Sequence, residues 1–307
     1  MNKDALADST RQRILNESRK LGISHELLTR RYVFERFLAR LAHSALRDRL
    51  VLKGAMALVA VTKSFGRATR DMDMLGLDRL TAAQALDAIR TIATTDPGDA
   101  DAISFDPMSF SAVEINQAHE EPGHQISGVA KIGSMQVPLK IEIVHGNVVS
   151  PAPMKMRYPT VLDGTTAPEI LCYTPETMLA EKFEAIVSLG TGTSRFKDFY
   201  DVRELSRKVP FVGASAAEAF RATFSQRSTE LPTVVPESFL SGFAQTGETG
   251  WKHFLKKLAT TDAQSFAEMV AEIEPFVMKI SAMARRDESE VDWTPGRGWS
   301  SPGPGIP

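Results

Sequence analysis

Two aspartates separated by one methionine constrain the fold of this chain more than any other feature. Asp71 and Asp73 lie in the stretch Arg70-Asp71-Met72-Asp73-Met74. On a strand, successive side chains point to opposite faces, so the two carboxylates share one face and the two methionines the other. Paired carboxylates beside a phosphate-binding turn form a site for a divalent metal and a nucleotide. The segment therefore indicates phosphoryl or nucleotidyl transfer.

The residues just upstream provide such a turn. Lys53 and Gly54 precede Ala55 in the stretch V-L-K-G-A-M-A-L, which reads as a turn that opens a helix over residues 54–62. Backbone N–H groups at the start of a helix bind phosphate.

Composition bounds the class of protein. The chain has 307 residues, 43% of them hydrophobic and 24% charged, which suits one large or two ordinary globular domains. With a net charge of −2, a nucleic-acid surface has to come from local clustering. The only cysteine, Cys172, excludes an intramolecular disulfide and a cysteine-based zinc site. We find no secretory signal and no apolar run of about 18 residues, so we expect a cytoplasmic protein without a membrane span.

Periodicity divides the chain into an α+β core with a mixed sheet, over residues 1–160, and a helical domain over 161–292. A Gly/Pro/Ser-rich tail at 293–307 is expected to be disordered. Predicted helices cover residues 8–21, 24–48, 54–62, 81–92, 214–226, 250–259 and 262–284, with another that starts at Pro175. Predicted strands cover residues 70–75, 103–105, 110–115, 126–132 and 136–144.

The second predicted helix is strongly basic. Between Arg19 and Arg49 the chain has eight basic and three acidic side chains. This pattern fits an ordinary solvated helix face and a phosphate-binding surface equally well. A second basic patch, Lys252, Lys256 and Lys257 near Trp251 and His253, is a weaker candidate for RNA contact.

The last predicted strand holds a third candidate carboxylate. In Pro138-Leu139-Lys140-Ile141-Glu142, Lys140 and Glu142 share the face opposite the apolar residues. If this strand lies beside the aspartates, three carboxylates can hold two magnesium ions roughly 3.5–4 Å apart. Taken alone, Glu142 reads as an exposed strand residue.

Downstream cations complete the pattern. Phosphoryl chemistry needs positive charge near the triphosphate as well as metal, and Lys182 is our candidate for that charge. Arg195 and Asp198 are three residues apart on a predicted helix and can interact. Asp198 then holds Lys182 or Arg195 in place, or accepts a proton. The alternative is a surface ladder of ion pairs.

Six motifs in this order resemble one family. They are Y-V-F-E-R-F-L-A-R-L at 32–41, L-V-L-K-G-A-M-A-L at 50–58, R-A-T-R-D-M-D at 67–73, L-K-I-E-I-V-H-G at 139–146, T-P-E-T-M-L-A-E-K-F-E-A-I at 174–186 and S-R-F-K-D-F-Y-D at 194–201. Together they resemble the AbiEii/AbiGii nucleotidyltransferase toxins, MenT-like members of the DNA polymerase beta-like superfamily. The resemblance covers about residues 30 to 205.

The resemblance implies a role for each matching position. Asp71 and Asp73 are the metal pair, and Glu142 is the third acid. Lys182 and Asp198 match the downstream catalytic lysine and aspartate. The nucleotide-binding positions are Lys53, Gly54, Ala55, Arg67, Thr69 and Lys182. In related toxins the hydroxyl region ahead of the aspartates is a target of neutralising phosphorylation, which implies Thr69 as a regulatory site.

The chain departs from the pattern at two positions. Ala55 follows Gly54 where the superfamily has serine and close relatives often have a second glycine, so no serine hydroxyl reaches the phosphate. Glu142 replaces the commoner aspartate, and its longer arm changes how it would hold metal.

The resemblance also implies a reaction. It is transfer of a nucleoside monophosphate from an NTP, with Mg²⁺ or Mn²⁺, to the 3′ end of tRNA, in a toxin that pairs with a separately encoded antitoxin. Two alternatives remain open: transfer to a protein or small-molecule hydroxyl, and a non-catalytic nucleotide-binding relative.

Overall fold

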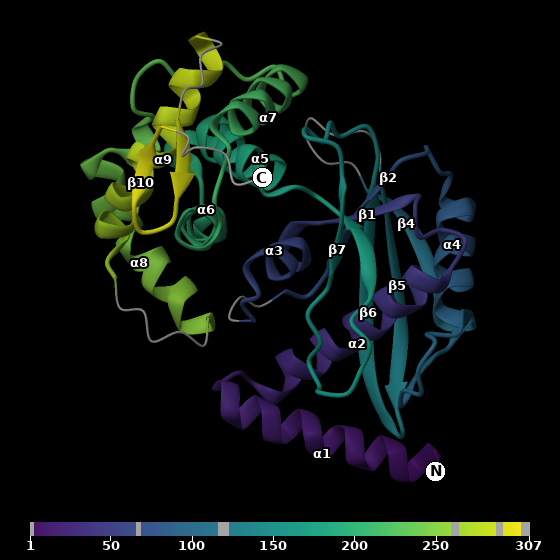
Figure 1. Cartoon of the computed structure of the whole chain (residues 1–307). Helices are drawn as coiled ribbons and strands as arrows, with labels where there is room; N and C mark the ends of the chain where they lie inside the picture. The colour runs from purple at the N-terminus through teal and green to yellow at the C-terminus, as the bar shows by residue number, and fades with distance from the viewer. Residues whose placement is uncertain (1–2, 66–68, 116–122, 259–263, 287–290, 302–307) are drawn as a thin grey trace. The chain divides into compact units, whose positions relative to one another are not determined.

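The computed structural model describes residues 3–65, 69–115, 123–258, 264–286 and 291–301. The chain forms two compact units (Figure 1). The first unit comprises Met1–Asn147 and Met154–Cys172, and the second comprises Val148–Pro153 and Tyr173–Pro307. Each unit is described by itself.

The first unit combines one sheet with four α-helices among its described residues. The helices are α1 (Lys3–Leu21), α2 (His25–His43), α3 (Gly54–Thr62) and α4 (Ala82–Thr94), with a 3-10 turn η1 (Pro107–Ser109). The strands are β1 (Leu50–Lys53), β2 (Met72–Gly76), β3 (Ile103–Phe105), β4 (Ser111–Ile115), β5 (Gly123–Ile132), β6 (Met135–Val144), β7 (Met154–Arg157) and β8 (Glu169–Cys172).

The sheet is mixed, as the sequence predicts. Its strand order is β3-β5-β6-β2-β1-β8-β7, and β4 pairs with β5. Strand β2 runs antiparallel to β1 and parallel to β6, and β1 runs parallel to β8. The strand with the two aspartates thus lies centrally, beside the strand that carries Glu142.

One face of this sheet is apolar and packs against helices. Met72 and Met74 of β2 and Ile141 and Ile143 of β6 are buried, and α2 and α4 pack on the sheet and on each other (Figure 1). Because side chains alternate along each strand, the residues between these positions face the other way. That opposite face carries the polar residues of the candidate site.

The basic residues of α2 correct the expectation of a solvated or phosphate-binding face. Arg31, Arg36 and Arg40 are buried. Asp101 accepts hydrogen bonds from Arg36 Nε at 2.8 Å and from Arg40 Nη1 at 2.7 Å, and Asp99 pairs with Arg36. Buried charges need such partners because desolvation is costly. Arg36 and Arg40 therefore stabilise the packing of α2, and none of the three buried arginines offers a surface for RNA.

The second unit is largely helical. Its helices are α5 (Pro175–Leu189), α6 (Phe196–Lys208), α7 (Gly213–Gln226), α8 (Ser241–Lys257) and α9 (Phe266–Arg286), with 3-10 turns η2 (Gly190–Gly192) and η3 (Glu237–Phe239). Phe183, Phe199 and Phe266 form the centre of an aromatic cluster between these helices, and Trp251 is buried beside it.

Two features differ from the expected domain plan. Strand β8 pairs with β1, so residues 169–172 belong to the sheet and not to the helical unit. The tail expected to be disordered from residue 293 instead contains an antiparallel pair, β9 (Asp292–Thr294) and β10 (Gly298–Ser300). Trp299 stacks there on Phe276, and Trp293 contacts the same ring in a tilted orientation. The packing of these large rings outweighs the turn-rich composition.

Among the described residues, none of the helices combines the length and the apolarity that crossing a bilayer requires.

Candidate functional site

Three adjacent strands bring the first-unit site residues together. Lys53, the last residue of β1, is opposite Asp73 in the antiparallel register. On the other side of β2, Asp73 is opposite Glu142 in the parallel register with β6. Facing residues on paired strands have Cβ atoms about 4.5–5.5 Å apart. The register thus places one lysine and two carboxylates in a single row.

Gly54 is the point where helix α3 begins against this row. Its φ is 64°, a left-handed conformation that glycine adopts without strain. A Cβ on residue 54 would lie 2.0 Å from Oδ2 of Asp73. The missing side chain therefore allows the start of α3 to approach the carboxylate. The next residue, Ala55, is buried.

Asp71 lies just ahead of β2, in a segment stabilised by a threonine. The hydroxyl of Thr69 donates a hydrogen bond of 2.9 Å to the backbone carbonyl of Asp71. Thr69 thus contributes to the backbone conformation that presents the aspartate. Arg67, predicted to contact the nucleotide, lies outside the described residues.

Lys140 is a site residue to which the sequence analysis gave no role. Its Nζ lies 2.7 Å from Oε1 of Glu142 and 3.6 Å from Oδ1 of Asp71. The hydrogen bond to Glu142 is the main cause that raises the pKa of Lys140 above its ordinary value, so this side chain is charged at neutral pH. The alternation Leu139-Lys140-Ile141-Glu142 was the signal for this contact, because it puts the lysine and the glutamate on one face.

The donor set of this face fits a divalent cation in one specific way. In the part of the chain that the structure describes, no three acidic, histidine or cysteine side chains gather into a set that could hold a metal ion. Magnesium is commonly held by one or two carboxylates together with substrate phosphates. Asp71 and Asp73 fit that arrangement, with a nucleotide completing the coordination.

A buried charge cluster in the second unit contains the other two predicted residues. Nζ of Lys182, on α5, lies 3.0 Å from Oδ1 of Asp198 and 3.6 Å from Oδ2 of Asp201, both on α6. Nε of Arg195 lies 2.6 Å from Oδ2 of Asp198. Asp198 is fully buried, whereas Lys182 keeps 16% of its side chain exposed. This is not the surface ladder of ion pairs given as the alternative.

The electrostatics of this cluster keep Asp198 ionised. Burial by itself would raise the pKa of Asp198, but the charges of Lys182 and Arg195 outweigh it and hold the pKa below its ordinary value. A carboxyl of this kind is a weak proton acceptor at neutral pH. Its physical effect is to hold Lys182, with Asp201 as a second partner that the sequence analysis did not single out.

The structure thus groups the predicted residues in two sets. Asp71, Asp73, Glu142, Lys53 and Gly54 lie together in the first unit. Lys182 and Asp198 lie together in the second unit.

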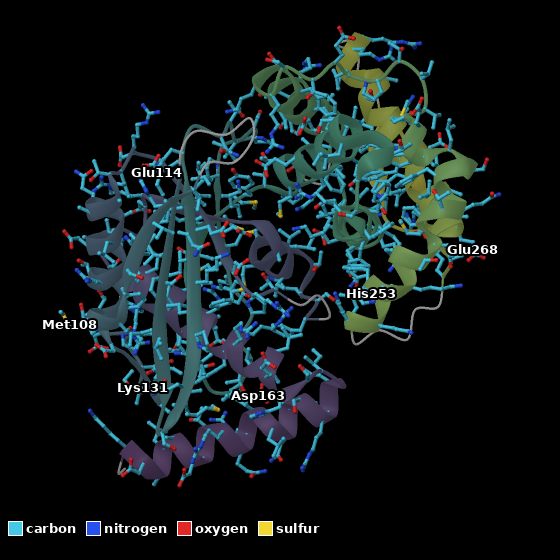
Figure 2. All side chains as sticks on the ribbon, turned by 180° about the vertical axis from the view of Figure 1, so that it is seen from behind. Met108, Glu114, Lys131, Asp163, His253 and Glu268 are labelled. Carbon is cyan, nitrogen blue, oxygen red and sulfur yellow. The ribbon has the colours of Figure 1, made fainter. Side chains whose placement is uncertain are left out.

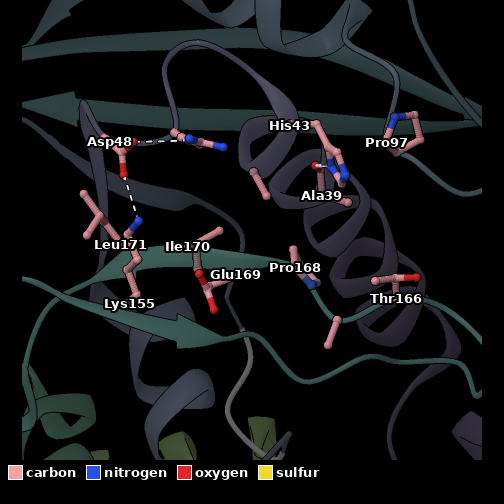
Figure 3. A pocket seen from close by; sticks show the side chains of 13 residues that line it. Ala39, His43, Asp48, Pro97, Lys155, Thr166, Pro168, Glu169, Ile170 and Leu171 are labelled. Carbon is pink, nitrogen blue, oxygen red and sulfur yellow. Dashed lines mark hydrogen bonds and ion pairs between the residues drawn. The ribbon is translucent and has the colours of Figure 1, made fainter.

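The first unit also contains a groove of about 280 Å³, between the end of α2 and the segment leading into β8 (Figure 3). His43, Pro97 and Glu169 line it, and Asp48 pairs at its edge with Arg47 at 3.2 Å and Lys155 at 3.4 Å. No described residue of the predicted site lines this groove. It is therefore distinct from the carboxylate face.

Two solved structures align with most of this chain. MenT4, a nucleotidyltransferase toxin from Mycobacterium tuberculosis, aligns with a TM-score of 0.50 and 13% identity, over 88% of this chain and 98% of its own. JHP933 from Helicobacter pylori aligns with a TM-score of 0.47 and 14% identity, over 86% of this chain and 95% of its own. The comparison with curated proteins finds no significant match.

The sequence itself carries the assignment. The family model of the nucleotidyl transferase AbiEii toxin of type IV toxin–antitoxin systems matches residues 36–272. That span includes every described residue of both sets in the candidate site. Since the match extends over most of the chain, the chain belongs to the AbiEii family of nucleotidyltransferase toxins and is a nucleotidyltransferase.

Proposed function

We propose that this enzyme transfers a nucleoside monophosphate from an NTP to the 3′ end of tRNA, with Mg²⁺ or Mn²⁺, and thereby blocks translation. The observation that carries the proposal is the row formed by Lys53, Asp73 and Glu142 across three paired strands. The start of α3 lies against that row at Gly54. Carboxylates next to the N-terminus of a helix suit a nucleotide triphosphate and its cation.

Each residue set has a part in the proposed reaction. Asp71 and Asp73 would hold the divalent cation, which when bound offsets negative charge on the phosphates. Lys53 and the first N–H groups of α3 bind phosphate oxygens. Lys182, which Asp198 and Asp201 hold in the second unit, is our candidate for a further positive charge in the reaction.

The bond changes follow from phosphoryl chemistry. A ribose hydroxyl of the acceptor attacks the α-phosphorus of the NTP, and the bond from that phosphorus to the bridging oxygen of pyrophosphate breaks. The hydroxyl proton passes to a carboxylate of the first-unit face, for which Glu142 is our candidate. The acceptor gains one nucleoside monophosphate, and pyrophosphate leaves.

Two partners follow from this proposal. RNA would contact the exposed basic patch on α8, because three of the arginines of α2, Arg31, Arg36 and Arg40, are buried. As a member of a toxin–antitoxin family, the protein has an antitoxin as its partner. A tRNA substrate would place the reaction in the cytoplasm, and Thr69 stays our candidate for regulation by phosphorylation.

The test is label transfer. Purified protein, Mg²⁺ and each α-labelled NTP in turn are incubated with and without total tRNA, beside an Asp71→Ala variant. We expect label on tRNA with one or more NTPs, and no label with the variant. Periodate oxidation of the tRNA, which destroys the 3′-terminal diol, should abolish the transfer.

Other outcomes distinguish the alternatives. Label that appears on protein and not on RNA contradicts the tRNA acceptor and moves the reaction to a protein hydroxyl. Metal-dependent nucleotide binding without any transfer contradicts the proposal and favours a binding role.

A further inference from the structure

Lys140, on the carboxylate face, affects how many divalent cations the site can bind. Lys140 extends from β6 and places its ammonium group between Glu142 of the same strand and Asp71 ahead of β2, at 2.7 Å and 3.6 Å from their oxygens. The three side chains are between 17% and 36% exposed. The contact thus joins two chain segments on the half-buried face that the predicted metal ligands share.

The pairing register of β2 with β6 places the ammonium group of Lys140 near Asp71. In the parallel pairing of β2 with β6, Met72 is opposite Ile141 and Asp73 is opposite Glu142. Lys140 lies two residues before Glu142 on β6. It therefore projects from the same face as Glu142, toward the chain that enters β2 at Asp71. A lysine here reaches Asp71 without any distortion of the sheet.

An ammonium group and a divalent cation compete for the same oxygens. Sites with two metals hold the ions roughly 3.5–4 Å apart, with carboxylates shared between them. A second ion between Asp71 and Glu142 would have to displace Lys140 or lie within a few ångströms of its charge, where Coulomb repulsion is strong.

We propose that Lys140 takes the place of a second divalent cation. The carboxylate face then binds one ion, at Asp71 and Asp73, and the ammonium group of Lys140 supplies the remaining positive charge. Besides its proposed role as proton acceptor, Glu142 holds Lys140 through one carboxylate oxygen, Oε1. Lys140 is a positioning residue that sets the metal stoichiometry. The inference rests on the metal dependence in the proposed function and makes it more specific.

The contact is more than an ordinary surface ion pair. Among the described residues, exposed lysines such as Lys20 and Lys252 pair with a glutamate on a neighbouring turn of the same helix, Glu17 and Glu248. Pairs of this kind contribute little to stability. Lys140 instead bridges two carboxylates from different segments of the predicted metal site. Its removal leaves a set of carboxylates whose mutual repulsion favours the uptake of another divalent cation or of a proton.

The experiment is an Mn²⁺ titration of the full-length protein, followed by the electron paramagnetic resonance signal of free Mn²⁺ at fixed ionic strength. We expect one Mn²⁺ per chain for the wild type. Lys140→Met removes the charge and keeps much of the side-chain length, so it should bind two Mn²⁺ per chain, the first about tenfold tighter or more. Lys140→Arg retains the charge and should keep the stoichiometry of one.

A matched control uses the same substitution on the same sheet. Lys131 lies on β5 near its turn to β6 (Figure 2), where it is opposite Gln136. Lys131→Met should bind one Mn²⁺ with the wild-type affinity. Asp71→Asn should weaken the single site, and circular dichroism of each variant monitors folding.

The outcomes separate this inference from the proposed function. Equal Mn²⁺ number and affinity in the wild type and Lys140→Met overturn the inference but leave a metal-dependent enzyme. Two ions per wild-type chain also overturn it. No Mn²⁺ binding in any variant overturns the inference together with the metal dependence, while label transfer to tRNA is still measured independently.

Discussion

The carboxylate of Asp73 occupies the space that a side chain at position 54 would need. A Cβ on Gly54 would be 2.0 Å from Oδ2 and 2.9 Å from Cγ of Asp73. Gly54 also has a φ of 64°, which disfavours any other residue. The glycine therefore meets two separate demands, of which only the contact with Asp73 concerns the chemistry.

Gly54→Ala should abolish label transfer, with a loss of about 100-fold or more, because the new methyl group forces Asp73 out of its position. The left-handed conformation adds a stability loss of about 1–2 kcal/mol. Initial rates of transfer and urea unfolding measure the two effects separately.

The control for this variant is Gly22→Ala. Gly22 has a φ of 66°, but a Cβ there would have no neighbour within 4 Å. We expect a comparable loss of stability and nearly full activity. If both variants lose activity to the same extent, backbone strain and not the position of Asp73 is responsible.

How far the sequence predicts this site depends on the kind of contact. Strand alternation predicts that Asp73 and Glu142 share a face if their strands are neighbours, and the parallel register of β2 with β6 brings them side by side. The contact of Gly54 with Asp73 depends on the antiparallel pairing of β1 with β2. Strand β1 has four residues, too few for periodicity to separate a strand from a turn.

Lys182→Met should make stability depend on pH in a new way. In the wild type, the pKa of Asp198 is held below its ordinary value. Its stabilising contribution is therefore complete above about pH 4 and is lost only as the pH falls further. Without Lys182, Arg195 is the remaining partner that opposes the effect of burial on Asp198. The pKa of Asp198 therefore rises, and the unfolding free energy should fall as the pH increases from 5 to 8. We expect a loss of about 3–5 kcal/mol at pH 8.

Guanidinium unfolding of both proteins at pH 5 and pH 8 measures this difference. Lys208→Met is the matched control, because Lys208 also pairs with a carboxylate, Glu204, at 2.7 Å, but is 38% exposed. It should change stability by no more than about 1 kcal/mol at either pH. If Lys182→Met has the same unfolding free energy at pH 5 and pH 8, Lys182 is not what keeps the buried carboxylate of Asp198 ionised.

Glu35 also makes stability depend on pH, but its pKa is raised in the folded protein, whereas that of Asp198 is lowered. Burial raises the pKa of Glu35 to about 7, although the backbone N–H of Val161 and the charge of Arg36 act against the shift. The folded protein thus binds more protons than the unfolded chain between about pH 4.5 and 7. The stabilisation is complete below that window and is lost as the pH rises through it.

Glu35→Gln should remove this pH dependence, because an amide does not titrate in this range. The amide oxygen can still accept the hydrogen bond of 2.6 Å from the backbone N–H of Val161. We compare the unfolding free energy of the variant with that of the wild type at each pH. This difference should be about 1–3 kcal/mol more favourable to the variant at pH 8 than at pH 5. Thermal unfolding at the two pH values measures it. Glu26→Gln, on the same helix but 83% exposed, should show no such difference, and an unchanged wild-type profile in Glu35→Gln would disprove the assignment.

The arginines of α2 show why burial of charge is hard to predict from one sequence. Helical spacing correctly places Phe34, Phe37 and Leu38 in the core. The same spacing gives no sign that Arg36 and Arg40 are also buried, because their partners Asp99 and Asp101 lie more than fifty residues away in the sequence. Only tertiary structure brings these acids to α2, and a count of basic residues therefore overstates the exposed positive charge.

The exposed basic residues of α8 are the place where we expect RNA contact instead. Lys256 and Lys257 lie in the last turn of α8 and are exposed, as is His253 one turn earlier (Figure 2). In the part of the chain that the structure describes, no acidic side chain pairs with either lysine. Charges of this kind bind phosphates and release counterions.

The double variant Lys256→Glu and Lys257→Glu should weaken tRNA binding about tenfold or more at moderate salt, and should reduce the slope of log affinity against log salt by about 1–2. Filter binding over a salt series measures both quantities. The matched control is Arg19→Glu with Lys20→Glu, which changes net charge equally in the exposed last turn of α1. If both double variants lower affinity and slope alike, net charge controls binding. A larger effect of the α8 variant assigns the contact to that helix. A lysine contributes to the slope of log affinity against log salt only if it contacts a phosphate, because that contact is what releases counterions.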